Sequence, residues 1–255
     1  MSSDPRRFDH LRDFLKDHVR QRTDFSQTPQ HRGEPAPDLQ QPCPATARRI
    51  TLPDGPAALE HCAAQPLAAA ILRRESCRRF APHPISFREL AALTWGTQGV
   101  RKRLGPHAAL RTVPSAGARH SFETYLAVHR VEHLAPGLYR YLPFEHQLAE
   151  LRLADDIAQQ AARACLDQRF VAEAALTFFW TTLPARMEWR YGEASHKVIA
   201  LDAGHLCQNL YLLSEAMGAG TCAIAAYDQD ACDALLGVDG RDAFTVYVAA
   251  VGKRA

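Results

Sequence analysis

Three polar side chains at alternate positions, Arg74, Ser76 and Arg78, form the first candidate site. In an extended segment, alternate side chains point to the same side. Two guanidinium groups and a hydroxyl on one side suit a phosphate that carries a polyol chain, because guanidinium groups bind phosphate through paired hydrogen bonds. Surface salt-bridge clusters have the same spacing, so the pattern alone leaves both interpretations open.

Three other segments offer small residues or charge. The loop 114–117, Pro-Ser-Ala-Gly, would let backbone N–H groups approach a ligand, although such a loop is also an ordinary turn. The run 221–226 is a second small-residue surface. Lys253 and Arg254 add positive charge just after the last predicted strand, where a phosphate could bind or the chain could simply fray.

Two motifs match known ligand sites in sequence but lack the required context. Residues 218–223 fit the dinucleotide pattern GxGxxA, which needs a strand before it and a helix after it; here the helix comes first. Residues 129–133 fit the zinc-protease pattern HxxEH, which needs both histidines on one helix. His129 instead ends a predicted strand, so we expect no metal site.

A long helix over residues 199–217 organises the predicted fold. Its apolar residues recur at steps of three and four, and further apolar residues widen this surface, which predicts burial on more than one side. Gly218 can adopt the left-handed conformation that ends a helix. We expect His205, on this helix, to be a satisfied core or interface group.

Shorter elements precede and follow this helix. Ser86 and Glu89 form a capping box for a helix over 87–95, and Asp228 caps a short helix from Gln229. The basic residues 101–103 are expected in a solvated loop. Further helices are predicted over 4–20, 57–72 with a break near Pro66, and 154–165; strands are predicted over 122–130, 138–141, 174–181 and 245–251. Interspersed helices and strands without a strict βαβ repeat indicate the α+β class.

Seven prolines fall within residues 21–56, which are therefore predicted to be an extended arm that crosses a surface, either its own or a partner's. We divide the chain into an N-terminal helix and arm, 1–56, and one folded domain, 57–255. The net charge of +2 and the mixed charge distribution indicate neither nucleic-acid binding nor a membrane surface. Seven scattered cysteines, with no CxxC pair and no secretory signal, favour a reducing, cytoplasmic compartment.

Five segments in order resemble the nitroreductase-like flavoproteins: RRESCRRF (73–80), VPSAGARH (113–120), 189–212, GAGTCAIAAYD (218–228) and the terminal VGK (251–253). Within that superfamily they are most similar to the SagB-type dehydrogenases, the azoline oxidases of peptide natural-product pathways. The resemblance covers about residues 67–255. It implies a central, mostly antiparallel sheet surrounded by helices, in an intertwined homodimer that binds FMN at its interface.

The resemblance also implies roles for individual residues. Arg74, Ser76 and Arg78 would hold the FMN phosphate and ribityl chain, with Lys253 adding charge. The loop would approach the flavin from the other subunit, and Gln168 would lie near the ring. The loop residues are Pro114, Ser115, Ala116 and Gly117, and those along the isoalloxazine edge are Ala223, Ile224 and Ala225.

The sequence departs at two positions from the families that it resembles. By this resemblance, nitroreductases have a glutamate near the flavin edge at the position of Ala225, and azoline oxidases have a Lys-Tyr pair at the positions of Arg190 and Tyr191. Arginine cannot act as a base, so Arg190 would hold substrate or favour the ionised form of Tyr191, which would be the acid/base residue. Trp189, Arg190 and Tyr191 could also be an ordinary packed aromatic pair with an exposed cation.

Three functions follow from the resemblance. The first is a dehydrogenase that oxidises a thiazoline, an oxazoline or a related bond, with hydride passing to the flavin, a proton to Tyr191, and oxygen reoxidising the flavin. The second is an NAD(P)H-dependent nitro- or quinone reductase. The third is a flavin-binding scaffold that acts only with other biosynthetic enzymes.

Overall fold

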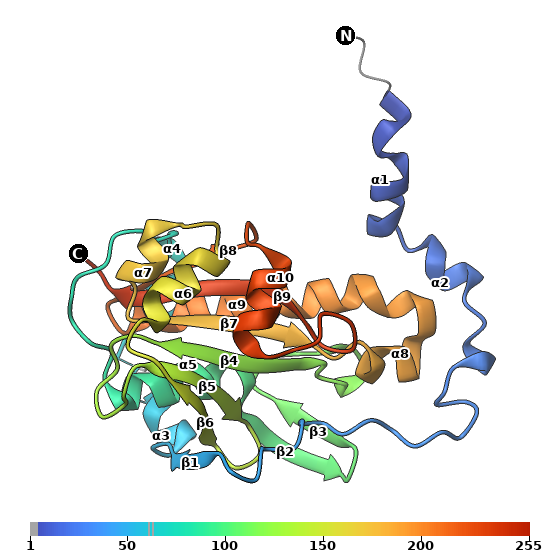
Figure 1. The fold of residues 1–255 in the computed structure, drawn as a ribbon. Coiled ribbons are helices and arrows are strands. Elements are labelled where there is room, and N and C mark those ends of the chain that lie inside the picture. The colour runs from blue at the N-terminus through green and yellow to red at the C-terminus, as the bar shows by residue number, and fades with distance from the viewer. Residues whose placement is uncertain (1–4, 61, 63) are drawn as a thin grey trace.

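The fold is built on one seven-stranded sheet in the order β1-β6-β5-β4-β7-β9-β8, with every neighbouring pair antiparallel (Figure 1). The computed structural model describes residues 5–60, 62 and 64–255. The strands are β1 (Arg48–Thr51), β4 (Phe122–Val128), β5 (Gly137–Leu142), β6 (Gln147–Leu153), β7 (Leu176–Thr182), β8 (Ala219–Ile224) and β9 (Phe244–Lys253). This sheet, with helices around it, confirms the predicted α+β class.

Helices cover both faces of the sheet, so its central strands are buried on both sides. The bounds are α3 (Gly55–Glu60), α4 (Leu67–Arg73), α5 (Phe87–Gln98), α6 (Ile157–Ala164), α7 (Arg169–Glu173), α8 (Ala185–Tyr191), α9 (Ser195–Ala216) and α10 (Gln229–Leu236). In β7, Phe178 and Trp180 join the core cluster beneath α5 and α9. Phe179 points the other way, into the cluster with α6 and α10. Burial on both faces explains why this strand is a continuous apolar run.

The predicted helix boundaries hold best where capping residues mark them. Ser86 and Glu89 form the predicted capping box of α5, with both reciprocal hydrogen bonds present. The Asp228 carboxylate accepts the backbone N–H of Ala231, 2.9 Å away, at the start of α10. Gly218 follows α9 with a φ of 66°, in the left-handed region.

Helix α9 is buried on one side only within the single chain. Its buried face includes Ile199, Ala203, Leu206 and Leu210, whereas Leu201 is 53% exposed. His205 is also exposed, with its Nδ1 3.9 Å from Asp202 Oδ1, so it is not a core group in this chain. The predicted burial of α9 on more than one side would therefore require contacts with another chain.

Several elements were not predicted. Residues 101–103, expected in a loop, lie in β2 (Val100–Gly105), which pairs with β3 (Ala108–Arg111) as a separate two-stranded ribbon. That prediction was wrong because an exposed ribbon needs no apolar alternation and its charged residues imitate a loop. Strand β6 and helices α7 and α8 were also missed. The predicted helix over 4–20 is two helices, α1 (Asp9–Leu15) and α2 (His18–Arg22), which project from the body (Figure 1).

The proline-rich arm lies on its own chain and supplies the edge strand β1. Buried arginines hold it by its carbonyl oxygens: Arg111 Nη2 donates to Leu39 O at 2.7 Å and Arg186 Nε to Asp38 O at 2.6 Å. Arg186 also pairs with Glu123 at 2.6 Å, and both side chains are almost fully buried. The Glu123 carboxylate in turn accepts the Gln41 backbone N–H at 2.8 Å, so one buried carboxylate joins the arm to the sheet.

Removal of this carboxylate should destabilise the whole fold. Glu123→Ala would leave the Arg186 guanidinium buried without its counter-charge, which typically costs about 3–5 kcal/mol. Chemical denaturation followed by circular dichroism would measure the change in free energy of unfolding. The matched control is Glu34→Ala, which breaks a half-exposed pair with Arg32 and should cost less than about 1 kcal/mol. Equal losses in the two variants would contradict the assigned importance of the buried pair.

Candidate functional site

Tyr211, on α9, connects two of the predicted cofactor segments. Its hydroxyl accepts the Ala223 backbone N–H at 2.8 Å and lies 3.0 Å from Ser76 Oγ. The Arg74 guanidinium lies over the same ring, 5.3 Å from its centre. The phenol proton can point to Ser76 Oγ, which leaves the Ser76 hydroxyl proton available to an outside acceptor. Residues 74–76 and 223 therefore form one polar surface around Tyr211.

The strand β8 orients the small residues of this surface. Ala223 is half-buried and Ala225 is exposed, whereas Ile224 is 3% exposed and packs into the core on the α6 side. Alternation along a strand explains this difference, so only the backbone of Ile224 can face the Tyr211 side. Gln168 closes the end of the segment, because its Nε2 donates to the Ala226 carbonyl oxygen at 2.8 Å.

Arg74 supplies free positive charge at this surface, and the charge of Arg78 acts on Cys222 in the adjoining strand β8. Neither forms an ion pair with any carboxylate in the described part of the chain. The Lys253 ammonium instead pairs with Glu89, and Arg254 pairs with Glu75 and Glu215. An anion would therefore meet Arg74 and Arg78 first, while Lys253 would have to share its charge with Glu89.

The loop 114–117 belongs to a second surface, where it meets Arg190 and Tyr191. Gly117 has a φ of 55°, and a methyl group on its Cα would lie 2.6 Å from Tyr191 Oη and 2.8 Å from Arg190 Nε. Both the left-handed conformation and the limited space favour glycine at this position. The structure thus brings together two predicted segments, the loop and the Arg190-Tyr191 pair, that lie more than seventy residues apart.

Asp202, on α9, contacts this loop from the side of the helix. It is 5% exposed, and burial raises the pKa of its carboxyl group, while the Ser115 hydroxyl and the Ala116 backbone N–H lower it. Ser115 Oγ also accepts the His120 backbone N–H at 2.9 Å. These contacts hold the loop in one conformation against the helix.

Several guanidinium groups surround the phenol of Tyr191. The Arg190 and Arg20 guanidinium carbons lie 5.8 Å and 6.0 Å from its ring centre. Arg119 lies over the neighbouring Trp189 ring at 4.6 Å, and its charge interacts with Tyr191. Because arginine keeps its proton, Tyr191 is the member of this cluster that can transfer one.

The two surfaces occupy different parts of one helix. Asp202 contacts the loop and Tyr211 contacts residues 74–76, and nine positions of α9 separate them, about 14 Å at the rise of an α-helix. A single chain therefore presents the predicted site as two halves, and the structure does not bring the loop to the Arg74 surface.

The rejected motifs have structural roles. Gly218 ends α9, and β8 follows it, so residues 218–223 do not form a dinucleotide turn. His129 is buried beside Ala174 O, and burial lowers its pKa to about 4. Within the described residues no group of three or more His, Cys, Asp or Glu side chains could hold a metal ion. All seven cysteines are free thiols, and no helix in the described ranges could cross a bilayer.

Comparison with known sequences identifies the family. The pattern named "Nitroreductase family" matches residues 71–253, so the chain belongs to the nitroreductase family. A protein of Methanocaldococcus jannaschii named for the nitroreductases is 30% identical over 161 residues, which span 63% of this chain and 79% of that protein. The trifolitoxin-processing protein TfxB of Rhizobium leguminosarum bv. trifolii is 30% identical over 112 residues, 42% of this chain and 30% of TfxB.

Solved structures agree on the fold. A nitroreductase-type protein of Ralstonia eutropha JMP134 has a TM-score of 0.65 and 26% identity, and the match covers 87% of this chain and 98% of that one. A chain of the Escherichia coli microcin synthetase McbBCD complex has a TM-score of 0.60 at 17% identity and covers 99% and 95%. The NADPH:FMN oxidoreductase of Vibrio harveyi has a TM-score of 0.52 at 16% identity and covers 74% and 68%. The nitroreductase fold is therefore established.

Two residues that organise the site, Tyr211 and Asp202, were not predicted from the sequence. Tyr211 is one of the residues that widen the predicted apolar surface of the long helix, and nothing in the pattern distinguishes Asp202. The sequence carries only a weak signal for either, a polar atom on the buried side of an apolar helix. Such an atom usually needs a hydrogen-bond partner, but the sequence does not say which one.

Gly117→Ala should disturb the contact between loop and tyrosine. A side chain in the left-handed region costs about 1–2 kcal/mol, and the new methyl group must also displace Tyr191 or Arg190. We expect lower stability and a shift in the fluorescence of the adjacent Trp189. Gly105→Ala is the matched control, because nothing lies within 4 Å of its added methyl group. An unchanged spectrum in Gly117→Ala would contradict the described contact.

Proposed function

We propose that this protein is an FMN-dependent oxidoreductase whose two half-sites come together in a homodimer. In this arrangement Arg74, Ser76 and Arg78 bind the FMN phosphate and ribityl chain, and the loop 114–117 of the other subunit approaches the flavin. Family membership supports an oxidoreductase, and flavin binding is typical of nitroreductase-family proteins. The exposed side of α9, with Leu201 53% exposed, supports a partner subunit at this helix.

The surface around Tyr211 fits the proposed cofactor in its chemistry. It combines the cations Arg74 and Arg78, which lack carboxylate partners among the described residues, with the hydroxyl of Ser76 held by Tyr211. The cations suit a phosphate and the hydroxyl suits a polyol. Ala223 and Ala225 leave room for a flat ring, and Gln168 would lie at its end. Lys253 contributes less in this proposal, because Glu89 already neutralises it.

Bound FMN would supply a two-electron acceptor. The chain itself must then orient the substrate and move one proton, and the cluster at 189–191 is suited to both tasks. Contact between Tyr191 Oη and the position of Gly117 is the observation that carries this assignment, since it places the phenol at the loop. Tyr191 takes the substrate proton and Arg190 holds the substrate, because a guanidinium group cannot act as a base.

For the substrate, we propose a thiazoline, an oxazoline or a related ring in a biosynthetic intermediate. The likeness to a protein named for trifolitoxin processing supports this choice, as does the fold shared with a microcin synthetase chain over nearly the whole length of this one. We place the protein in the cytoplasm, because its seven scattered cysteines are free thiols, as is typical of a reducing compartment. A scaffold role within a complex of biosynthetic enzymes is a further candidate, which the Arg190-Tyr191 pair in place of Lys-Tyr supports.

An NAD(P)H-dependent nitro- or quinone reductase is the second candidate, favoured by the family and by the match to an NADPH:FMN oxidoreductase. The two activities differ in what reduces the flavin. Rapid bleaching of the flavin absorbance by NAD(P)H in stopped-flow experiments would favour the reductase, and its absence would favour the dehydrogenase.

The cofactor proposal predicts a yellow dimer. Purified protein should show flavin absorbance and elute at dimer size on gel filtration. Arg74→Gln should weaken FMN binding by about tenfold or more, the usual effect of removing one charge-assisted contact. Arg49→Gln, an exposed arginine in β1, is the matched control and should bind FMN normally. A wild-type protein that stays colourless with added FMN would refute the proposal.

Tyr191→Phe tests the proton transfer. Loss of a general acid/base residue typically slows catalysis by about 10²–10⁴-fold. We expect this loss in the turnover of a panel of azoline peptides, measured as the removal of two hydrogens by mass spectrometry, with the flavin spectrum unchanged. Tyr227→Phe, at the α10 side of the sheet, should retain full activity. If Tyr191→Phe turns over normally, Tyr191 is not the acid/base residue.

A further inference from the structure

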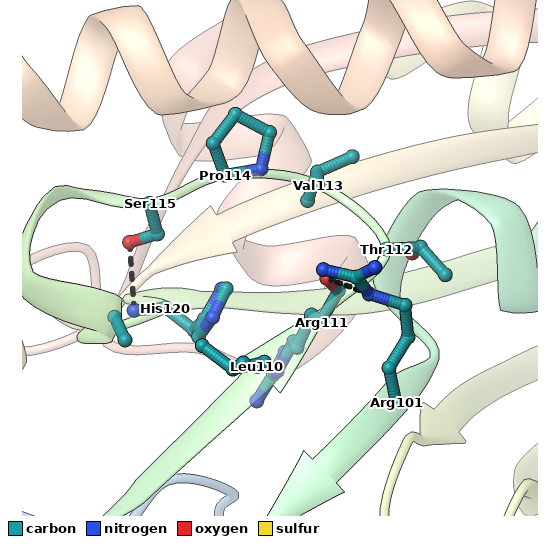
Figure 2. A pocket seen from close by; sticks show the side chains of 9 residues that line it. Arg101, Leu110, Arg111, Thr112, Val113, Pro114, Ser115 and His120 are labelled. Atoms are coloured by element: carbon teal, nitrogen blue, oxygen red, sulfur yellow. Dashed lines mark hydrogen bonds between the residues drawn. The ribbon is translucent and has the colours of Figure 1, made fainter.

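A cavity of about 520 Å³ lies between the loop and the β2–β3 ribbon (Figure 2). Its volume is within the range of small-molecule sites. The residues lining it are Arg101, Leu110, Arg111, Thr112, Val113, Pro114, Ser115, Ala118 and His120. Of these described residues none is acidic. Pro114 and Ser115 belong to the loop that Tyr191 contacts, so this cavity borders the proposed active site without including its Arg74 surface.

Arg101 places an unoccupied guanidinium fork at this cavity. Its Nε donates to the Arg111 carbonyl oxygen at 3.0 Å, which fixes the direction of the side chain. Figure 2 shows the guanidinium group lying across that carbonyl, beside Thr112. The two terminal nitrogens have no partner among the described residues, and the residue is exposed. Two parallel N–H groups of this kind match the two oxygens of a carboxylate.

Arg111 adds a second positive charge behind the cavity wall. It is 2% exposed, and its terminal nitrogens donate to neutral acceptors, Gln98 Oε1 and Leu39 O, each at 2.7 Å. Its Nε has no hydrogen-bond partner in the described part of the chain. Glu123 is the buried carboxylate whose charge acts on Arg111, and it is also paired with Arg186. Two buried cations therefore share one counter-charge, and the net positive potential favours an anion in the adjacent space.

Two other titratable groups lie near this cavity, His120 and Asp202. Burial and the charge of Arg111 lower the pKa of His120 to about 3, so its ring is neutral near pH 7. Asp202 borders a small adjoining cavity that shares Ser115 and His120 with this one. It lies on the helix side of the loop, where Ser115 and Ala116 already interact with it.

We propose that this cavity is a binding site for an organic carboxylate, with the carboxylate on the Arg101 fork and the apolar body against Leu110 and Pro114. The mixed lining separates this ligand from inorganic phosphate, which would make no use of the apolar wall. The bound acid then borders the same loop that contacts Tyr191. The inference that this acid is part of the substrate rests on the proposed function. The inference that an acid binds in this cavity does not.

Calorimetric titration of the purified full-length protein tests the site without any turnover. The probes are benzoate and hippurate, each compared with its neutral amide, and inorganic phosphate. We expect each acid to bind at least tenfold more tightly than its amide, and this preference to weaken as salt is added. Preference for hippurate over benzoate would indicate a peptide terminus as the natural source, and the reverse would indicate a simple acid; both support the site.

Arg101→Gln should remove the preference, weakening acid binding about tenfold while leaving the amides unchanged. The matched control is Lys102→Gln, since Lys102 is the next residue in β2, is exposed, and does not line the cavity. Equal binding of acids and amides, tighter binding of phosphate than of benzoate, or the same loss in both variants would overturn the proposal. A colourless protein that still shows the Arg101-dependent preference would refute the flavin proposal and leave this site intact.

Discussion

The attachment of α9 to the sheet determines where both halves of the candidate site lie. Its apolar side packs on the core, and two polar atoms on that side find specific partners: the Asp202 carboxylate meets the loop 114–117, and the Tyr211 hydroxyl binds Ser76 and Ala223. Because a helix is rigid, the distance between these anchors is fixed by the number of residues between them. A change in how α9 packs would therefore move both half-sites together, which makes the helix the common support of everything proposed above.

Buried arginines are a second constraint, because their N–H groups need hydrogen-bond acceptors, and the arm supplies several of these acceptors. Arg111, Arg140 and Arg186 are nearly inaccessible, and each donates to carbonyl oxygens between Asp38 and Pro42. An extended, proline-rich segment has few internal hydrogen bonds, so its carbonyl oxygens are available as acceptors. The arm is thus part of the folded unit, and Arg111, one of the arginines that hold it, also adds positive charge beside the loop.

Local signals in the sequence were enough to predict much of this fold. The capping residues of α5 and α10, the apolar run of β7 and the periodicity of α9 each depend on neighbouring residues, and the structure confirms them. The β2–β3 ribbon, β1 and α8 were missed because pairing or packing with distant residues creates them. The candidate site divides in the same way. The small-residue loop could be predicted from composition, whereas its contact with Tyr191 and its support by Asp202 exist only in three dimensions.

The position of Arg190 has a chemical consequence for any reaction at this loop. A lysine there could exchange its proton with Tyr191, but an arginine can only donate hydrogen bonds and retain its charge. With Arg20 and Arg119 also near, the phenol faces cations on several sides, and none of them can act as a base. Charge of this kind favours a substrate that is itself anionic or that becomes so as it loses a proton. In the proposed function, Arg190 and the arginine-lined cavity beside the same loop would therefore select for the same property of the substrate, by independent contacts.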